Sequence, residues 1–378
     1  MNRFSRKTVP ILAAIVASIL FSCYKPTPFV LAQPPKSPYQ FPSSSTIATF
    51  LGTTNTNFKI AYVLTNNGAA DVYYVDFNDS APAPIALSKP ASLANLDADK
   101  PLLSPDGTFV TFGLFNGKNI EGAYIQKLNT TAKPVLISAT GTRPHWFQDP
   151  ATGSLYIIYS TEFFIGTTTM PSSGSAFTLK QQVSLADTGS RVGSAVQIAP
   201  YPMIGGLSGD GTFLCSGYEA ACFYDIPSDS LISINPGVQI CNPSIDPDPD
   251  TSDRMMFLNF GGVQAMNNPL KSDPAYPADS QGVLPMHSVL FIADTSNTVI
   301  NFIPISIMGS GYAAWQCPQW SNKPNFAAAL ASSNDNGSSW DLVLLKNVGI
   351  RGSEKTQLMT VGSGKMNTES TPSLWIGN

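Results

Sequence analysis

Short apolar segments separated by polar turns run along most of the chain. The clearest example is residues 100–112, in which an apolar segment, a Pro-Asp-Gly turn and a segment of alternating apolar and polar residues follow one another. A turn of this composition between two such segments predicts a β-hairpin. Heptads are absent from the sequence, which excludes a coiled coil and favours an all-β chain.

The start of this hairpin, here called the anchor, recurs in degraded form along the chain. It begins at six positions: Pro101, Pro144, Gly205, Pro243, Pro318 and Pro372. Each of the first five is followed by a second apolar strand. The anchors are spaced close to, or wider than, the roughly 40 residues that one four-stranded propeller blade needs. The pattern therefore predicts six blades, some of which carry insertions.

The sixth anchor is too close to the C-terminus at Asn378 to be followed by another strand. Strands suited to complete its blade occur at the other end of the chain, over residues 59–63, 72–75 and 85–87. We therefore predict a six-bladed β-propeller, all-β, closed by pairing of N- and C-terminal strands in one blade. Such pairing removes the open edge between the first and last blades.

The anchors resemble the repeat of TolB-like β-propellers, whose units carry a Pro-x-Trp-Ser-Pro-Asp-Gly signature. The resemblance covers about residues 46–378 and implies the same fold, although such propellers host many unrelated functions. Residues 333–340, Ser-Asn-Asp-Asn-Gly-Ser-Ser-Trp, are similar to the Asp-box of sialidases and other propellers, a structural β-hairpin turn.

The N-terminus has the pattern of an export signal. Arg3, Arg6 and Lys7 precede a mostly apolar run from Val9 to Phe21, and Leu20-Phe21-Ser22-Cys23 resembles a bacterial lipobox. We predict a lipoprotein signal peptide over residues 1–22, lipidation of Cys23 and a Pro/Ser-rich tether over residues 23–45. Cleavage after Ala32 is the alternative. The protein is then expected at the bacterial cell envelope, lipid-anchored, periplasmic or surface-exposed.

Composition narrows the class of partner. Charged residues make up 12% of the chain, about half the usual fraction. Three of the 21 Lys and Arg residues lie in the predicted export signal, so 18 remain, against 25 Asp and Glu. The basic residues do not cluster into a stripe along the sequence. This balance argues against nucleic acid and favours an envelope protein or an extracellular polysaccharide as the partner.

A catalytic centre cannot be assembled from the sequence. The chain has two histidines, His145 and His287, and none of the motifs of zinc proteases or P-loop enzymes. Ser208 lies in Gly-Leu-Ser-Gly-Asp, which superficially resembles a nucleophile elbow, but its context is strand-turn-strand and not strand-turn-helix. We interpret Ser208 as a turn residue and name no catalytic residue.

Ligand-binding residues are expected on one face of the ring. The turn that follows each inner strand defines one face, the turn face, and the opposite face, the loop face, receives two long insertions at residues 163–176 and 261–287. Long loops at a propeller mouth are where binding residues collect. The predicted ligand-binding residues are Arg143, Trp315, Tyr276 and His287.

The turn face carries an acidic run, residues 246–253. Asp246, Asp248 and Asp250 offer oxygen ligands for Ca²⁺, although the run also suits a solvated turn. No other cofactor is expected.

Four cysteines follow Cys23, and export permits disulfides. Cys215 and Cys222 flank a hairpin turn, and Cys241 and Cys317 precede the anchor prolines of consecutive blades. These spacings suggest the pairs 215–222 and 241–317, with buried free thiols as the alternative. Together the patterns favour an exported binding or scaffolding module for a polysaccharide or protein; a glycoside hydrolase or lyase on the propeller is the second hypothesis.

Overall fold

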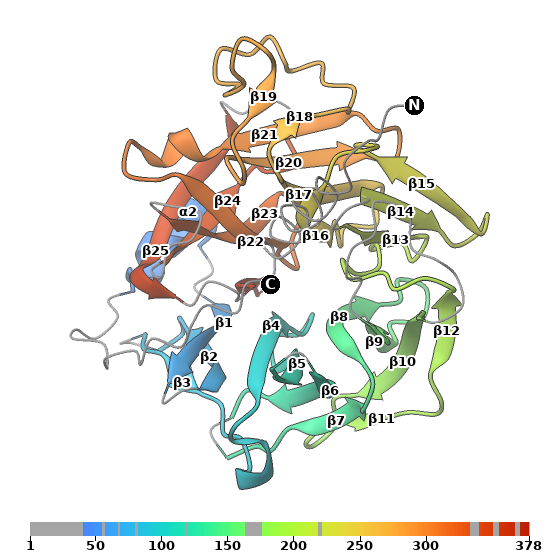
Figure 1. Cartoon of the computed structure of the whole chain (residues 1–378). Coiled ribbons are helices and arrows are strands. Elements are labelled where there is room, and N and C mark those ends of the chain that lie inside the picture. Colours follow the sequence, from blue (N-terminus) through green and yellow to red (C-terminus); the bar gives the residue numbers. More distant parts are fainter. Residues whose placement is uncertain are drawn as a thin grey trace, which may run out of the picture.

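The computed structural model describes residues 41–54, 57–66, 69–79, 82–117, 119–129, 131–162, 176–217, 221–332, 340–350, 355–366 and 371–377. Six β-sheets are arranged as blades around a central axis (Figure 1). The fold is therefore the predicted six-bladed β-propeller. The signal, residues 163–175 of the first insertion and the Asp-box up to residue 339 lie outside the described residues.

The first three blades follow one another in sequence. Blade 1 consists of β4 (Asp97–Leu103), β5 (Phe109–Asn116), β6 (Asn119–Lys127) and β7 (Val135–Ser138). Blade 2 consists of β8 (Thr142–Gln148), β9 (Leu155–Ser160), β10 (Thr178–Ser184), β11 (Ser190–Arg191) and β12 (Val196–Ala199). Blade 3 consists of β13 (Phe213–Ser216), β14 (Ala221–Asp225) and β15 (Ser230–Ile234).

The other three blades complete the ring. Blade 4 consists of β16 (Ile240–Ile245), β17 (Arg254–Asn259), β20 (Val289–Asp294) and β21 (Val299–Pro304), with a side hairpin of β18 (Gly262–Val263) and β19 (Val283–Leu284). Blade 5 consists of β22 (Ala314–Trp320), β23 (Phe326–Ser332), β24 (Trp340–Lys346) and β25 (Gln357–Met366). Blade 6 consists of β26 (Ser373–Ile376), β1 (Phe58–Asn66), β2 (Ala69–Asp76) and β3 (Ile85–Ala86).

Blade 6 contains both ends of the propeller. The C-terminal strand β26 pairs antiparallel with β1, with Leu374 opposite Ile60 and Trp375 opposite Lys59. The indole N–H of Trp375 donates to the carbonyl oxygen of Pro105 in blade 1 at 2.8 Å. The predicted closure is therefore present, and it also joins blade 6 to blade 1.

The anchor prolines mark a repeated bulge in the inner strands. The residue before the proline is left-handed in four blades, at Lys100, Arg143, Asn242 and Cys317, with φ between 47° and 50°. The pairing register shifts at the same place in each of these strands. A proline cannot donate to the ladder, so a bulge is where a strand tolerates it.

The inner segment of blade 3 is irregular, and glycine stands there in place of the anchor proline. The segment forms no named strand, but it pairs with β13 through the bridge between Leu207 and Leu214 and through backbone hydrogen bonds such as that from Gly205 N–H to Cys215 O. The Cβ of any larger residue at Gly205 would lie 2.3 Å from the Cys215 sulfur. The close approach of these two segments therefore requires glycine.

Six apolar clusters fill the six contacts between neighbouring blades. Among the described residues, the cluster between blades 5 and 6 is the largest, with 18 buried residues, and the cluster between blades 1 and 2 is the smallest, with five. The other four contain eight to 15. The contact between blades 1 and 2 therefore has the fewest buried apolar residues among those described.

Helix α2 (Ser44–Leu51) and the η1 (Ala91–Leu93) and η2 (Ile305–Met308) turns are the helical elements of the described residues. Ser43 caps α2 by accepting from Thr46 N–H, and Ile47 and Leu51 pack into the cluster between blades 5 and 6. The Phe41 ring lies 5.9 Å from that of Phe77. The folded domain thus begins at least five residues before the predicted boundary at 46. No helix within the described part of the chain is long and apolar enough to cross a membrane.

Candidate functional site

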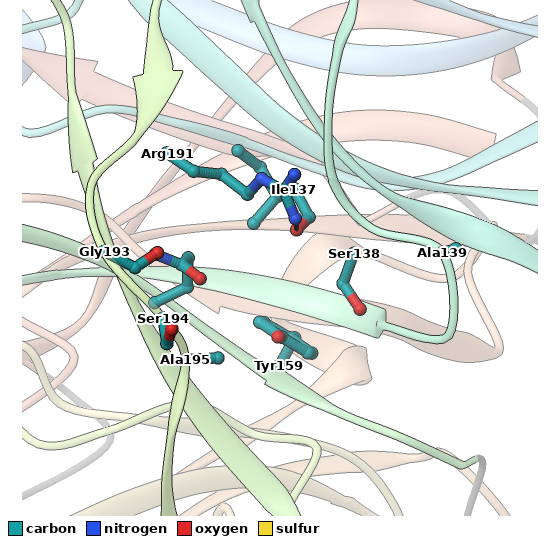
Figure 2. Close-up of a pocket in the computed structure, with 9 residues that line it drawn as sticks. Ile137, Ser138, Ala139, Tyr159, Arg191, Gly193, Ser194 and Ala195 are labelled. Atoms are coloured by element: carbon teal, nitrogen blue, oxygen red, sulfur yellow. Dashed lines mark hydrogen bonds between the residues drawn. The ribbon is translucent and has the colours of Figure 1, made fainter.

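A pocket of about 580 Å³ lies at the outer rim of the ring, between blades 1 and 2. Its lining comes from Ile137, Ser138, Ala139, Tyr159, Gln181, Arg191, Gly193, Ser194 and Ala195. Figure 2 shows residues 193–195 on one side and Ser138 and Ala139 on the other, with the Arg191 side chain reaching towards Ile137 and with Tyr159 between the two sides. We call this the inter-blade pocket. It coincides with the smallest of the six apolar clusters, so incomplete packing between these blades leaves the space.

Local sequence explains how the Arg191 side of the pocket is built. Gly189, at φ +83°, reverses the chain after β10, and β11 then pairs back onto it with Arg191 opposite Val183. The side-chain amide of Gln181 donates to the carbonyl oxygens of Val192 at 3.0 Å and Gly193 at 3.3 Å. This buried amide therefore holds the Gly193 wall against β10.

Arg191 is the one charged residue among the described residues that line the pocket. Its Nη1 donates to Ile137 O at the long distance of 3.5 Å. The three ion pairs formed by the described residues involve Lys59, Lys89 and Arg143, so Arg191 takes part in none of them. Most of its five N–H donors therefore remain available to a ligand.

Tyr159 forms the floor of the pocket, and its hydroxyl is sensitive to its neighbours. Burial raises the pKa of Tyr159, while a hydrogen bond with Ser138 and the positive charge of Arg191 act in the opposite direction. The pocket thus joins a guanidinium, a phenol and small hydroxyl and backbone groups, a set that hydrogen-bonds polar ligands.

The predicted residue Arg143 lies elsewhere, on inner strand β8. Its Nε is 3.8 Å from the Asp99 carboxylate, and its side chain is 15% exposed. Nearby, the Lys100 ammonium and the His145 ring approach the same carbonyl oxygen, that of Ile204, at 3.4 Å and 3.1 Å. Arg143 therefore belongs to a polar group that ties the inner strands of blades 1, 2 and 3 together.

Burial dominates the electrostatics of this inner group. The pKa of Lys100 falls to about 8, chiefly because the side chain is buried and also because Arg143 is near. Burial likewise holds the pKa of His145 well below 6.5. The structural role expected for His145 is the one its geometry shows.

Trp315 and His287, which the sequence analysis predicted as ligand-binding residues, are both buried in the structure. Trp315 is completely buried in the cluster between blades 4 and 5, where its indole N–H donates to Ile303 O at 3.1 Å. His287 is also buried, and its carbonyl accepts from Trp315 N–H. The sequence places Trp315 next to an anchor, but β22 directs it into the neighbouring blade.

Tyr276 and its insertion also lie away from the mouth. Residues 261–287 form the β18–β19 hairpin at the outer edge of blade 4 (Figure 1). The Tyr276 ring is edge-on to Phe302 at 5.1 Å and packs on the cluster between blades 3 and 4. The part of this insertion around Tyr276 therefore packs against the cluster between blades 3 and 4.

The acidic run forms a hydrogen-bonded turn. The Asp246 carboxylate accepts from Asp248 N–H at 3.0 Å and from the Thr251 hydroxyl at 2.8 Å, and Asp248 accepts from Asp250 N–H at 3.1 Å. Burial raises the pKa of Asp246 to about 6. Within the described residues, no three His, Cys, Asp or Glu side chains are grouped to hold a metal ion.

Ser208 has the expected turn role. Its hydroxyl donates to Asp210 and accepts from Thr212 and Phe213 N–H, as Ser104 does with Asp106, Thr108 and Phe109.

None of the four described cysteines forms a disulfide, which corrects the predicted pairs 215–222 and 241–317. Cys215 is opposite Phe223 in the β13–β14 ladder, and Cys222 is opposite Ser216. This offset by one residue places the two sulfurs on opposite faces of blade 3, in different clusters. Cys241 and Cys317 are also buried and unbridged.

Sequence reasoning missed Arg191 as a site residue. The available signal was an arginine within Gly-Ser-Arg-Val-Gly-Ser, residues 189–194, where small residues leave a side chain room to reach a ligand. Its proximity to residues 137–139 depends on how blades 1 and 2 pack against each other. The sequence pattern does not reveal this contact.

Comparisons with solved structures find other propellers at low similarity. One is a prolyl endopeptidase, with 13% identity and a TM-score of 0.37, matched over 97% of this chain. The chain spans only 57% of that protein's length. The β-propeller domain of the trilobed protease from Pyrococcus furiosus matches at 12% identity and a TM-score of 0.39, over 80% of this chain and 82% of that one.

The β-propeller domain of Cps50 (Swd1) from Myceliophteria thermophila matches at 9% identity and a TM-score of 0.38, over 78% of this chain and 81% of that one. No protein-family model matches the chain, and no curated protein matches it in sequence. With identities of 9–13% and TM-scores of 0.37–0.39, these likenesses assign no family, ligand or activity to this chain.

Proposed function

We propose that this chain is an exported, lipid-anchored binding module of the TolB-like propeller type, which holds a polysaccharide or protein ligand at the bacterial cell envelope. The observation that carries the binding role is the inter-blade pocket, which combines a ligand-sized volume with an arginine outside the ion pairs of the described residues. Ligand pockets commonly have volumes of about 300–1,000 Å³.

Exposed apolar side chains next to the pocket support the same role. Six large hydrophobic residues are exposed in the described part of the chain. Three of them, Leu136, Val192 and Val196, are direct sequence neighbours of pocket residues. The segments that form the pocket therefore also carry half of the large apolar side chains exposed among the described residues.

The pocket lining favours binding over hydrolysis. Glycoside hydrolases generally need two carboxyl groups on either side of the scissile bond. None of the described residues that line the pocket is acidic. The carbohydrate-active enzyme is therefore not the function that this geometry supports best.

The envelope location rests on the lipobox-like sequence that ends in Cys23. Radiolabelled palmitate should enter the full chain expressed in a bacterium and should not enter the Cys23→Ser variant. Equal labelling of the two chains, or none of either, would reject the lipid anchor.

The binding role is tested with the chain from residue 24 onward, immobilised and exposed to a glycan array and, separately, to a native envelope extract. We expect retention of a defined glycan or of one envelope protein at stoichiometric yield. Cooperative unfolding of the immobilised protein verifies that it is folded. If the folded protein retains neither a glycan nor an envelope protein, the proposal is overturned.

A further inference from the structure

We infer that the inter-blade pocket binds an acidic sugar residue, with the sugar carboxylate on the Arg191 guanidinium and the sugar hydroxyls on Ser138, Ser194 and Tyr159. This inference rests on the proposed binding function and names the chemical class of its ligand.

The charge of the pocket selects an anion. Arg191 brings one positive charge, and the described lining residues bring no negative charge to balance it. Arg143 differs, because the Asp99 carboxylate lies 3.8 Å from it. A guanidinium offers a planar fork of donors that matches a carboxylate in two hydrogen bonds. Arg191 is thus placed, at the pocket, to receive an anionic group from outside.

The remaining lining suits a sugar better than a peptide side chain. Ser138, Ser194 and Tyr159 contribute hydroxyls that both donate and accept, as sugar hydroxyls require. Ala139, Gly193 and Ala195 are small, and Ile137 is the single large aliphatic residue of the lining. The pocket therefore lacks the deep apolar recess that anchors a peptide, while its 580 Å³ accommodates one or two sugar rings.

The position of Arg191 is held by the protein before any ligand arrives. Val192 N–H donates to Gln182 O at 2.9 Å, and the Gln181 amide binds the carbonyls of Val192 and Gly193. The backbone at Arg191 is therefore fixed to β10. Ligand binding then has to order only the Arg191 side chain, so it loses less conformational entropy than it would if the backbone were also mobile.

The test uses calorimetric titration with glucuronate, galacturonate and short oligogalacturonides, beside glucose, galactose and the fully methyl-esterified oligogalacturonides as neutral partners. Arg191→Gln removes the charge, Arg191→Lys keeps the charge without the fork, and Lys133→Gln removes an exposed cation that does not line the pocket. The thermal melting of each variant verifies that it is folded.

We expect at least one acid to bind ten-fold or more tightly than its neutral partner. Arg191→Gln should abolish this preference, Arg191→Lys should retain part of it, and Lys133→Gln should leave it unchanged. Equal affinity for acid and neutral sugar, or an equal loss in Lys133→Gln, would overturn the inference while leaving the binding function in place.

If none of these sugars binds, but one purified envelope protein binds and is released by Arg191→Gln, the ligand is a protein and the inference fails alone. If neither sugars nor envelope components bind to any variant, the proposed function fails with it.

Discussion

Ser373 accepts a hydrogen bond of 3.0 Å from the backbone N–H of Leu103, although 270 residues separate the two in sequence. The last strand of the chain is thus joined to the first complete blade by a side chain as well as by its own ladder with β1. The closure of the ring is therefore concentrated in β26, where it can be tested by small changes.

The contact between Gly107 and Trp375 gives a matched test of closure. A Cβ at Gly107 would lie 2.4 Å from the Trp375 ring, whereas at Gly153 it would have no described heavy atom within 4 Å; both glycines have φ +69°. Gly153→Ala therefore measures the backbone cost alone, about 1 kcal/mol. Gly107→Ala adds the steric clash with Trp375, so it should lower the free energy of unfolding by about 2–4 kcal/mol in total. Urea unfolding of the two variants measures both losses. Equal effects of the two substitutions would show that Trp375 does not pack on this turn.

Deleting residues 371–378 should reopen the ring. The deletion removes the buried side chains of Leu374, Trp375 and Ile376 and exposes the edge of β1. Each buried apolar side chain is worth about 1.5–3 kcal/mol, so the melting temperature should fall by many degrees. A truncated chain that melts within about 2 °C of the full chain, a small shift on the usual scale, would contradict closure by this strand.

The six blades were predictable because the anchor is a local signal. Pro-Asp-Gly turns and prolines at strand bulges restrict the backbone wherever they occur, so their recurrence indicates the repeat even when other positions differ. Gly205 was also identified as an anchor, although its strand is irregular. The irregularity arises from the close approach of Cys215, a contact between segments that the pattern does not contain.

The candidate site was not predictable in the same way. Trp315 was expected at the mouth, and the structure buries it, because the choice between the two faces of β22 depends on the packing of blade 4 against blade 5. Arg191 was not selected, because its pocket exists only where blades 1 and 2 pack incompletely. Binding residues at a contact between blades depend on docking, which a single sequence reports poorly.

The buried, unbridged cysteines give a direct chemical prediction. Cys215 and Cys222 are completely buried, and burial raises the pKa of Cys222 to about 12 and that of Cys215 still further. The thiols of Cys215, Cys222, Cys241 and Cys317, which are all buried, should therefore react with a thiol reagent only after unfolding, and a reductant should leave the melting temperature unchanged. A bridged peptide containing Cys215 and Cys222 in non-reducing mapping would contradict the ladder register.

Asp246 should make stability depend on pH in the acidic range. Its pKa rises from 3.8 to about 6 on folding because the carboxyl is buried, so the folded chain binds a proton that the unfolded chain releases. Stability should therefore fall as the pH rises from about 4 to about 6, by up to about 3 kcal/mol from this group.

Asp246→Asn cannot titrate, so the free energy of unfolding of the variant relative to the wild type should increase over this pH window. Urea unfolding at several pH values between about 4 and 7 measures the difference. A difference that is constant with pH would show that the Asp246 pKa is not raised.

The central claim, that the inter-blade pocket is the binding site, is tested most directly by filling it. Ser194→Trp places an indole in the pocket, and Thr152→Trp places the same group on the exposed turn between β8 and β9 of the same blade, on the turn face. The measurement is the dissociation constant of each variant for the ligand retained from the array or the envelope extract. The account predicts that Ser194→Trp weakens binding at least ten-fold, about 1.4 kcal/mol, while Thr152→Trp binds as the wild type does. Unchanged affinity in a folded Ser194→Trp chain would contradict it.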